Sequence, residues 1–216
     1  MILIDLTGGE NHPAYQKFAI ENGSRQYDFL RSAVEGALAV NRPFLSQTVL
    51  KALNFHAIAC LHTSAGEFRP CPVTVGEYHP PAEFQVPGLM DDFVNQVNRH
   101  WVEQDALVLA AFVLWRLNYI HPFINGNGRT ARAACLFVLC VKLGGWLPGT
   151  PILPELIRQN RGEYVEIMKA VDASAEKGAL DLGALHDFLA RLLEQQLASA
   201  NSSDEATEDG PNDDGK

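Results

Sequence analysis

The fold of this chain is decided by residues 121–132, HPFINGNGRTAR, which we call the motif segment. Two Asn-Gly pairs lie between a histidine and two arginines. The apolar stretch ALVLAAFVLWRLNY precedes the motif segment, and TARAACLFVLCVKLGG overlaps its end and continues it. Helical sequence that is apolar nearly all round indicates a buried helix. We therefore expect a buried central helix, a glycine-containing turn and a second helix.

The turn between these helices has the residues of an anion site. A helix N-terminus directs unpaired backbone N–H groups at a bound anion. Gly126 and Gly128 allow the backbone to approach a phosphate and to adopt positive φ, and Asn127 tolerates the same conformation better than most residues. Arg129 and Arg132 add permanent cations suited to bidentate phosphate contacts. The predicted ligand is a polyphosphate.

His121 lies at the mouth of this turn. An unperturbed imidazole has a pKa of about 6.5, so at neutral pH it can accept a proton from an incoming hydroxyl. Together with the anion site, it indicates nucleophilic displacement at phosphorus, driven by positioning and charge stabilisation. The alternative is a structural histidine that precedes the helix-breaking Pro122.

The motif segment resembles the signature of the Fic family, H-P-F-x-(D/E)-G-N-G-R-x-x-R. Two further stretches are similar to the family: SAGEFRPCPVTVGEYHPPAEF resembles the region before and through its flap hairpin, and NRGEYVEIMKAVD its tyrosine-bearing helix. The resemblance covers roughly residues 25–175. It implies an enzyme that moves AMP from ATP to a hydroxyl of a target protein, with ATP as substrate and Mg²⁺ as cofactor.

The resemblance also implies roles for single residues. His121 would be the general base, and Phe123 would anchor the motif segment in the core. The anion-binding turn would be formed by Gly126, Asn127 and Gly128. Arg129 would contact the phosphates. Arg132 would contact the γ-phosphate or a regulatory glutamate.

A flap is expected at residues 67–76, where Pro70 and Pro72 precede the β-favouring Val73, Thr74 and Val75. Short exposed strands tolerate proline where central strands do not. An exposed strand edge can pair with an extended target segment through backbone hydrogen bonds and so present one side chain to the site. The alternative is a hairpin that only covers the core.

Asn125 departs from the family, which has aspartate or glutamate at this position as its Mg²⁺ ligand. Mg²⁺ prefers carboxylates together with substrate phosphates and waters, and an amide oxygen brings no charge. Three interpretations stay open. Asn125 is a nearly isosteric, mildly impaired ligand, or it marks an altered reaction, or it marks a largely inactive nucleotide-binding protein.

A second departure concerns regulation. Residues 31–36, RSAVEG, match the last two positions of the family's inhibitory pattern (S/T)-x-x-x-E-(G/N), but Arg31 takes the first. The resemblance implies that Glu35 pairs with Arg132, displaces the γ-phosphate and so inhibits the enzyme. A glutamate over the site could also serve a hydrolytic water and allow removal of AMP. The alternative is an exposed i,i+4 pair between Arg31 and Glu35.

The expected fold class is all-α, a Fic-type helical core with a small β-hairpin flap. The expected division is an N-terminal extension at 1–23, one domain at 24–197 and an acidic tail at 198–216. An inhibitory helix would run from about 24 to 40. Ser46 and Asp105 are predicted to cap the starts of two further helices. The segment from Leu197 to the end is acidic and nearly free of large apolar residues, so we expect disorder, with an interaction tail as the alternative.

Composition narrows the function classes. The chain has 216 residues, a formal net charge of -9 and 47% hydrophobic residues. No basic surface is indicated, which argues against nucleic acid as a partner. The four cysteines have no metal-ligand spacing, and Cys135 and Cys140 lie in apolar sequence as expected for reduced core thiols. No signal peptide or membrane span is apparent, so a cytoplasmic location is expected, and a homodimer is compatible with the family.

Three functions are therefore weighed. The first is a self-inhibited protein adenylyltransferase with weakened metal dependence and a target presented along the flap. The second is a Fic-fold enzyme that transfers another phosphate-containing group. The third is a nucleotide-binding regulatory module whose chemistry is impaired at Asn125.

Overall fold

The structure, a computed structural model, describes residues 2–42 and 45–208, and the side chains of these residues up to 200. Within this part of the chain the fold is helical and contains no strand beyond two isolated bridges. The helices are α1 (Leu3–Thr7), α2 (Pro13–Val40), α3 (Gln47–Ile58), a 3₁₀ turn (Glu83–Gln85), α4 (Val86–Arg99), α5 (Ala106–Ile120), α6 (Asn127–Lys142), α7 (Leu153–Gln159), α8 (Arg161–Glu176) and α9 (Gly183–Glu208). The predicted all-α class is confirmed.

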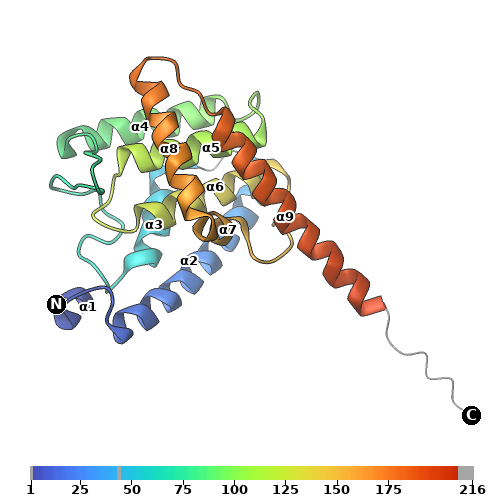
Figure 1. The fold of residues 1–216 in the computed structure, drawn as a ribbon, viewed down its shortest axis with the longest axis horizontal. Helices are drawn as coiled ribbons and strands as arrows, with labels where there is room; N and C mark the ends of the chain where they lie inside the picture. Colours follow the sequence, from blue (N-terminus) through green and yellow to red (C-terminus); the bar gives the residue numbers. More distant parts are fainter. Residues whose placement is uncertain (1, 43–44, 209–216) are drawn as a thin grey trace, which may run out of the picture.

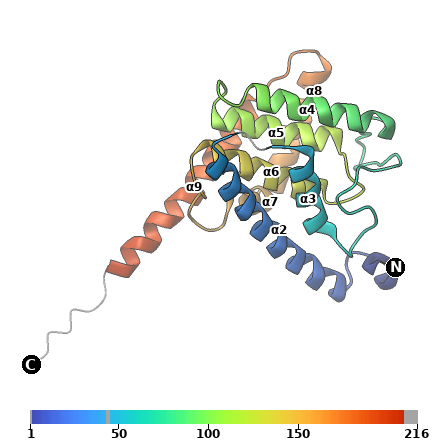
Figure 2. The same cartoon turned by 180° about the vertical axis from the view of Figure 1, so that it is seen from behind.

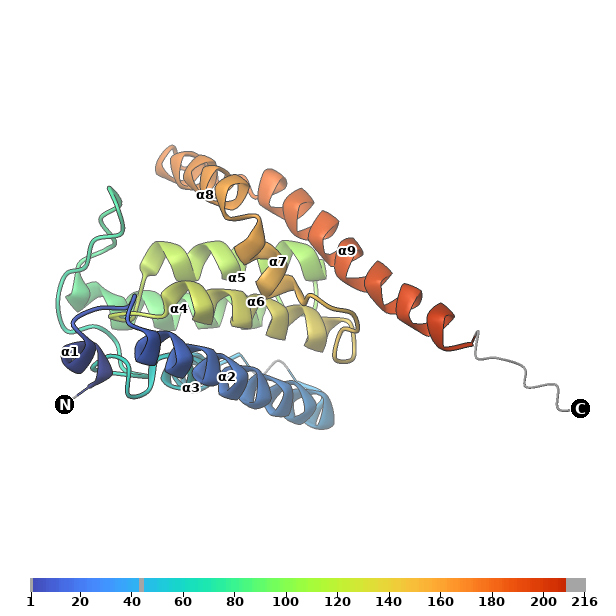
Figure 3. The same ribbon diagram turned by 60° about the horizontal axis from the view of Figure 1, so that its bottom comes forward.

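The helices form three layers. Figure 3 shows α4, α5 and α6 in a middle layer, with α1, α2 and α3 on one side and α7, α8 and α9 on the other. Helices α2 and α3 pack against each other and against α6, and Figure 2 shows them side by side on that face. On the opposite face, α7 packs on α6, and α8 and α9 pack on α5. The middle layer is therefore covered on both faces.

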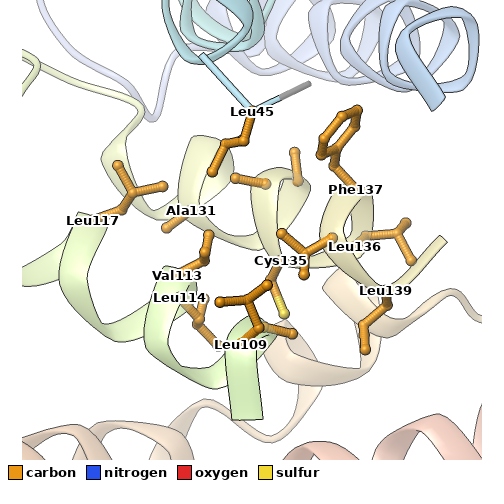
Figure 4. Close-up of a cluster of buried hydrophobic side chains, with 14 of the residues drawn as sticks. Leu45, Leu109, Val113, Leu114, Leu117, Ala131, Cys135, Leu136, Phe137 and Leu139 are labelled. Carbon is orange, nitrogen blue, oxygen red and sulfur yellow. The ribbon is translucent and has the colours of Figure 1, made fainter. Parts of the chain in front are cut away.

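Helices α5 and α6 pack against each other at the centre of the core. Because both are shielded on several sides, apolar residues occur around most of their circumference. Buried apolar side chains of α5, α6 and Leu45 form a cluster in the core, shown in Figure 4. Its labelled members are Leu45, Leu109, Val113, Leu114, Leu117, Ala131, Cys135, Leu136, Phe137 and Leu139. Cys135 and Cys140 are buried free thiols, as predicted. Among the described residues no helix has the length and apolar character needed to cross a bilayer.

Two helix starts agree with the sequence. The Ser46 hydroxyl accepts a hydrogen bond from the Val49 N–H (3.2 Å) at the start of α3. The Asp105 carboxylate accepts hydrogen bonds from the first-turn N–H groups of α5, which lowers the pKa of this carboxyl. These caps satisfy donors that a helix N-terminus otherwise leaves unpaired.

The N-terminal part of the chain differs from the prediction. Helix α2 begins at Pro13 and runs through position 24, so residues 13–23 are not a separate extension. Tyr15 and Asn22 are buried, and the Asn22 amide donates to the Ala59 carbonyl (2.9 Å). Polar side chains that pack through such hydrogen bonds leave no apolar periodicity in the sequence. For this reason the predicted helix start, at about residue 24, lies later than the observed start at Pro13.

The C-terminal boundary also lies elsewhere. Helix α9 continues through the predicted start of the tail, at residue 198, to Glu208, and it extends well beyond the rest of the fold (Figure 1). The Ser199 hydroxyl accepts a hydrogen bond from the Thr150 N–H (2.9 Å). This part of α9 therefore contacts the segment between α6 and α7. The rest of the predicted acidic tail, 209–216, lies outside the described residues.

The flap is not a regular hairpin. Within residues 67–76, Phe68 forms an antiparallel bridge with Phe123 of the motif segment, and Val75 forms a bridge with Tyr78. Pro70 and Pro72 carry no N–H group and cannot donate to a ladder between these two points. The expected two-stranded hairpin is therefore reduced to two isolated bridges.

Candidate functional site

The motif segment connects the buried helices α5 and α6. His121 caps the C-terminus of α5 in the left-handed region (φ 50°), and Gly126 caps the N-terminus of α6 (φ 77°). Between them, the Asn127 side chain accepts a hydrogen bond from the Phe123 N–H (2.9 Å) and donates one to the Phe123 carbonyl (2.8 Å). Phe123 is fully buried, as predicted. The loop is thus closed by its own residues.

Below the loop, the fully buried Asn54 of α3 joins three segments of the chain. Its amide nitrogen donates to the Asn125 carbonyl (2.9 Å) and to the Thr130 hydroxyl (3.3 Å). Its amide oxygen accepts from the Gly66 N–H (3.0 Å), just before the flap. Asn54 could not be predicted from the sequence, because a single polar residue in an apolar helix has no local pattern.

The glycines of the loop are required by space as well as by conformation. A Cβ at Gly126 would lie 2.6 Å from Ile58 Cγ2, and the positive φ there disfavours other residues. A Cβ at Gly128 would lie 3.2 Å from a guanidinium nitrogen of Arg132, which therefore lies against the first turn of α6. Gly126 has no side chain to cap α6, so the N–H groups of this turn are available to an anion.

His121 is held in the form of a base. Its Nδ1 lies 3.3 Å from the Asn118 carbonyl oxygen. Because a carbonyl only accepts, this contact favours the tautomer with the proton on Nδ1 and leaves the lone pair on Nε2. Burial lowers the pKa of His121, with a smaller contribution from the positive charge of Arg69, while the contact with Asn118 opposes this shift. Burial therefore favours the neutral form of the imidazole.

The two arginines of the motif segment point to different surroundings. Arg129 donates to the Ala57 carbonyl at the end of α3 (2.8 Å) and to the Asn125 side-chain oxygen (3.2 Å). Arg132 lies beside Gly128 and faces Tyr27 and Tyr164, and burial lowers its pKa. Arg132 is therefore the guanidinium next to the anion turn, whereas Arg129 is engaged by carbonyl oxygens.

Asn125 lies between a cation and an anion. Its Oδ1 accepts from Arg129, and its Nδ2 donates to the carboxylate of Glu10 (3.1 Å). The same Glu10 oxygen lies 3.2 Å from His62 Nε2, which in turn lies 2.7 Å from the Tyr15 hydroxyl. This polar cluster was not predicted, since its members come from three distant parts of the chain.

The donors around Asn125 limit the kind of metal site that fits. In the described part of the chain, no group of three or more His, Cys, Asp or Glu side chains is arranged to hold a metal ion. The motif segment itself contains no acid. Mg²⁺ commonly needs only one or two carboxylates when phosphates and waters complete its shell. One carboxylate, that of Glu10, lies next to Asn125, so the residues present fit a cation whose other ligands are nucleotide phosphates and waters.

Glu35 is not brought to the site. Its carboxylate pairs with Arg31 of the same helix (3.9 Å), and its side chain is 72% exposed. The predicted pair between Glu35 and Arg132 is therefore replaced by the i,i+4 alternative. Helix α2 buries a different face against α3 and α6, formed by residues such as Leu30, Val34 and Ala37, and this turns Glu35 to solvent.

The flap is fixed to the motif segment by a buried arginine. Arg69, 2% exposed, donates through Nε to the His121 carbonyl (2.8 Å) and through its other nitrogens to the carbonyls of Cys71 (3.1 Å) and Pro81. Its backbone N–H donates to the Pro122 carbonyl (2.8 Å). Figure 1 shows the flap region beside the α5–α6 connection, at the same end as the N-terminus.

Comparison with known proteins agrees with this geometry. A family model described as Fic/DOC family matches residues 44–139, which include the whole motif segment. This part of the chain, from residue 44 to residue 139, is similar to the Fic/DOC family. The chain is 33% identical over 129 residues to "Protein adenylyltransferase Fic" of Drosophila persimilis, covering 58% of this chain and 24% of that protein. The chain thus spans about a quarter of the length of the curated Fic relatives it matches.

Solved Fic structures share the fold. A Fic domain containing signaling protein from Bacteroides thetaiotaomicron superimposes with a TM-score of 0.68 at 22% identity, over 93% of this chain and 79% of that one. A Fic family protein from Desulfovibrio desulfuricans gives a TM-score of 0.61 at 20% identity, over 93% and 72%. At this level of identity the likeness concerns the helical architecture alone.

Proposed function

We propose that this protein is a nucleotidyltransferase that moves AMP from ATP to a hydroxyl side chain of a target protein. The observation that carries the proposal is a neutral imidazole, His121, beside a glycine turn at a helix N-terminus. The names of the matched Drosophila relatives add support, since they are protein adenylyltransferases. A base and an anion site at this spacing suit attack of a hydroxyl on a phosphoryl group.

The proposed reaction uses this chain's residues in three ways. His121 Nε2 accepts the proton of the target hydroxyl as its oxygen forms a bond to the α-phosphorus of ATP. The bond from the α-phosphorus to the bridging oxygen breaks, and pyrophosphate leaves with the electron pair. The N–H groups of Asn127 and Gly128 and the guanidinium of Arg132 stabilise the phosphate charge. A divalent cation would neutralise further phosphate charge on the Asn125 side of the loop.

The flap is the proposed surface for the target protein. Residues 74–77 and Cys71 are exposed, so backbone groups near the flap tip are accessible. An extended segment could pair with them with little demand on its sequence. Arg69 ties the base of this surface to the carbonyl of His121, which would place a presented hydroxyl close to the imidazole.

A second candidate is a nucleotide-binding module with impaired chemistry. One observation favours it: Arg129, which the resemblance assigns to phosphate, already donates to Ala57 and Asn125. An arginine engaged in this way has to exchange partners before it contacts a nucleotide. In the proposal above, Arg132 therefore contributes more phosphate affinity than Arg129.

Labelled ATP distinguishes these functions. We expect incorporation of label from the α-phosphate but not from the γ-phosphate, measured as self-modification of the purified protein. His121→Ala should reduce incorporation by roughly 100-fold or more, the usual contribution of a general base. His100→Ala, at an exposed histidine after α4, is the matched control and should behave as wild type. Label from the γ-phosphate would indicate a kinase-like transfer, and nucleotide binding without either label would favour the impaired module.

A further inference from the structure

The motif segment lacks a carboxylate, yet one lies against it. We propose that Glu10, from the N-terminal segment, is the ligand that this site offers to a divalent cation bound with the nucleotide phosphates. It would replace in space the acid that position 125 lacks in the sequence. This inference rests on the proposed function, because it concerns the same nucleotide site.

The first argument is position. A Glu10 carboxylate oxygen is 3.1 Å from the side-chain nitrogen of Asn125, so it lies within one hydrogen bond of the residue that the family uses as its ligand. The Glu10 side chain is 52% exposed, which leaves it open to solvent and to a bound ion. Asn125 directly precedes the N-cap residue of α6, where the positive end of the helix dipole also favours a negative charge.

The second argument explains the asparagine. Asn125 uses both ends of its amide, since only its oxygen can accept from Arg129 and only its nitrogen can donate to Glu10. An aspartate at 125 would place a second carboxylate against Glu10, and like charges at this separation disfavour each other's ionisation. A neutral amide at 125 and an acid at 10 are therefore complementary.

The third argument is that the segment carrying Glu10 is fixed in place. The backbone N–H of Leu3 donates to the Cys60 carbonyl (2.8 Å), and the Gln16 amide donates to the Glu10 carbonyl (2.6 Å). His62, only 11% exposed, contacts through Nε2 the same Glu10 oxygen as Asn125 (3.2 Å). These contacts come from α1, α2 and the segment that follows α3. The Glu10 carboxylate is thus positioned by contacts with the fold, although its side chain is about half exposed.

The experiment measures nucleotide affinity, so it needs no turnover. Binding of α,β-methylene ATP is followed by calorimetry in Mg²⁺ and in EDTA for the full chain, and the ratio of the two dissociation constants is the readout. The ratio is the dissociation constant in EDTA divided by that in Mg²⁺. We expect Glu10→Gln to lower this ratio by about 10-fold, as for loss of a group that supports a metal. The affinity in EDTA should be unchanged or tighter. The matched control is Glu21→Gln, at an exposed acid on the same helix as Tyr15.

A charge swap makes the assignment specific. The double variant Glu10→Gln/Asn125→Asp moves the carboxylate from position 10 to position 125 of the loop. It should restore the wild-type ratio of the dissociation constants in EDTA and in Mg²⁺. Circular dichroism of each variant checks that the helices are intact. The proposal is overturned if Glu10→Gln keeps the wild-type ratio, if it tightens binding equally with and without Mg²⁺, or if the swap restores nothing. Absence of nucleotide binding by the wild type in both conditions would instead contradict the proposed function itself.

Discussion

The motif segment and the flap lie against each other but are held in different ways. The motif segment is fixed along its length by buried side chains, with Asn127 closing it from within and Asn54 supporting it from below. The flap is fixed near its two ends, by Arg69 and Tyr78, and the stretch between them is largely exposed. Chemistry at phosphorus depends on fixed geometry, whereas backbone pairing with a target depends on access.

The largest expected effect is on the support of the motif segment. Asn54→Ala removes the side-chain partner of the buried Gly66 N–H and of the partly buried Asn125 carbonyl. Unsatisfied buried groups cost about 1–3 kcal/mol each, so we expect a loss of about 2–3 kcal/mol in the free energy of unfolding. Urea denaturation measures it. Asn95→Ala, at an exposed position on α4, is the control and should change stability by less than about 0.5 kcal/mol.

A smaller effect is expected at the far end of the flap. The Tyr78 hydroxyl donates to the Tyr119 carbonyl (2.7 Å), and Tyr78→Phe removes this bond while keeping the ring. We expect a loss of about 1 kcal/mol in unfolding free energy, together with faster proteolysis within the flap. A cost as large as that of Asn54→Ala would mean that the two regions are fixed to the same degree.

The smallest effect concerns Arg69, which joins the flap to the motif segment through the His121 carbonyl. Burial, with help from Arg69, lowers the pKa of His121, so the acidic limb of the transfer rate should lie below the ordinary value of about 6.5. The lowered pKa contributes to the free energy of unfolding above the ordinary pKa of about 6.5. This contribution is lost as the pH falls through the pKa of His121 in the folded protein. NMR titration should show a higher His121 pKa in Arg69→Met than in wild type. Arg69→Lys keeps the charge and should leave the pKa nearly unchanged.

A reversed result would change the interpretation of Arg69. If Arg69→Met left the His121 pKa unchanged while Arg69→Lys lost transfer activity, the guanidinium would act only through its hydrogen bonds. In that case Arg69 would position the His121 peptide without influencing the imidazole, and the flap and the base would be coupled by geometry alone.

Local patterns predicted the parts of the molecule that depend on neighbours in sequence. The apolar helices, the caps at Ser46 and Asp105 and the glycine turn at Gly126 follow from helix periodicity, capping and backbone conformation. The placement of Phe123 in the core followed from the family resemblance and is confirmed. Family motifs were informative here because they describe a short segment whose residues contact one another.

The polar contacts between distant segments could not be predicted in the same way. Glu10, Asn54 and Arg69 act on the motif segment from other helices and loops, and none of them has a local pattern. Glu35 illustrates the converse. It had a matching local pattern, but the face of α2 that packs on the core is chosen by all its buried residues, and that choice leaves Glu35 in solvent.

The left-handed backbone of His121 has a consequence for how this protein balances folding against chemistry. A residue at this kind of helix end is most often glycine, and a side chain there costs on the order of 1 kcal/mol. On stability alone, glycine is the preferred residue at position 121. Replacement of His121 by glycine is therefore expected to stabilise this helix end and to keep the carbonyl that Arg69 contacts, while it removes the imidazole.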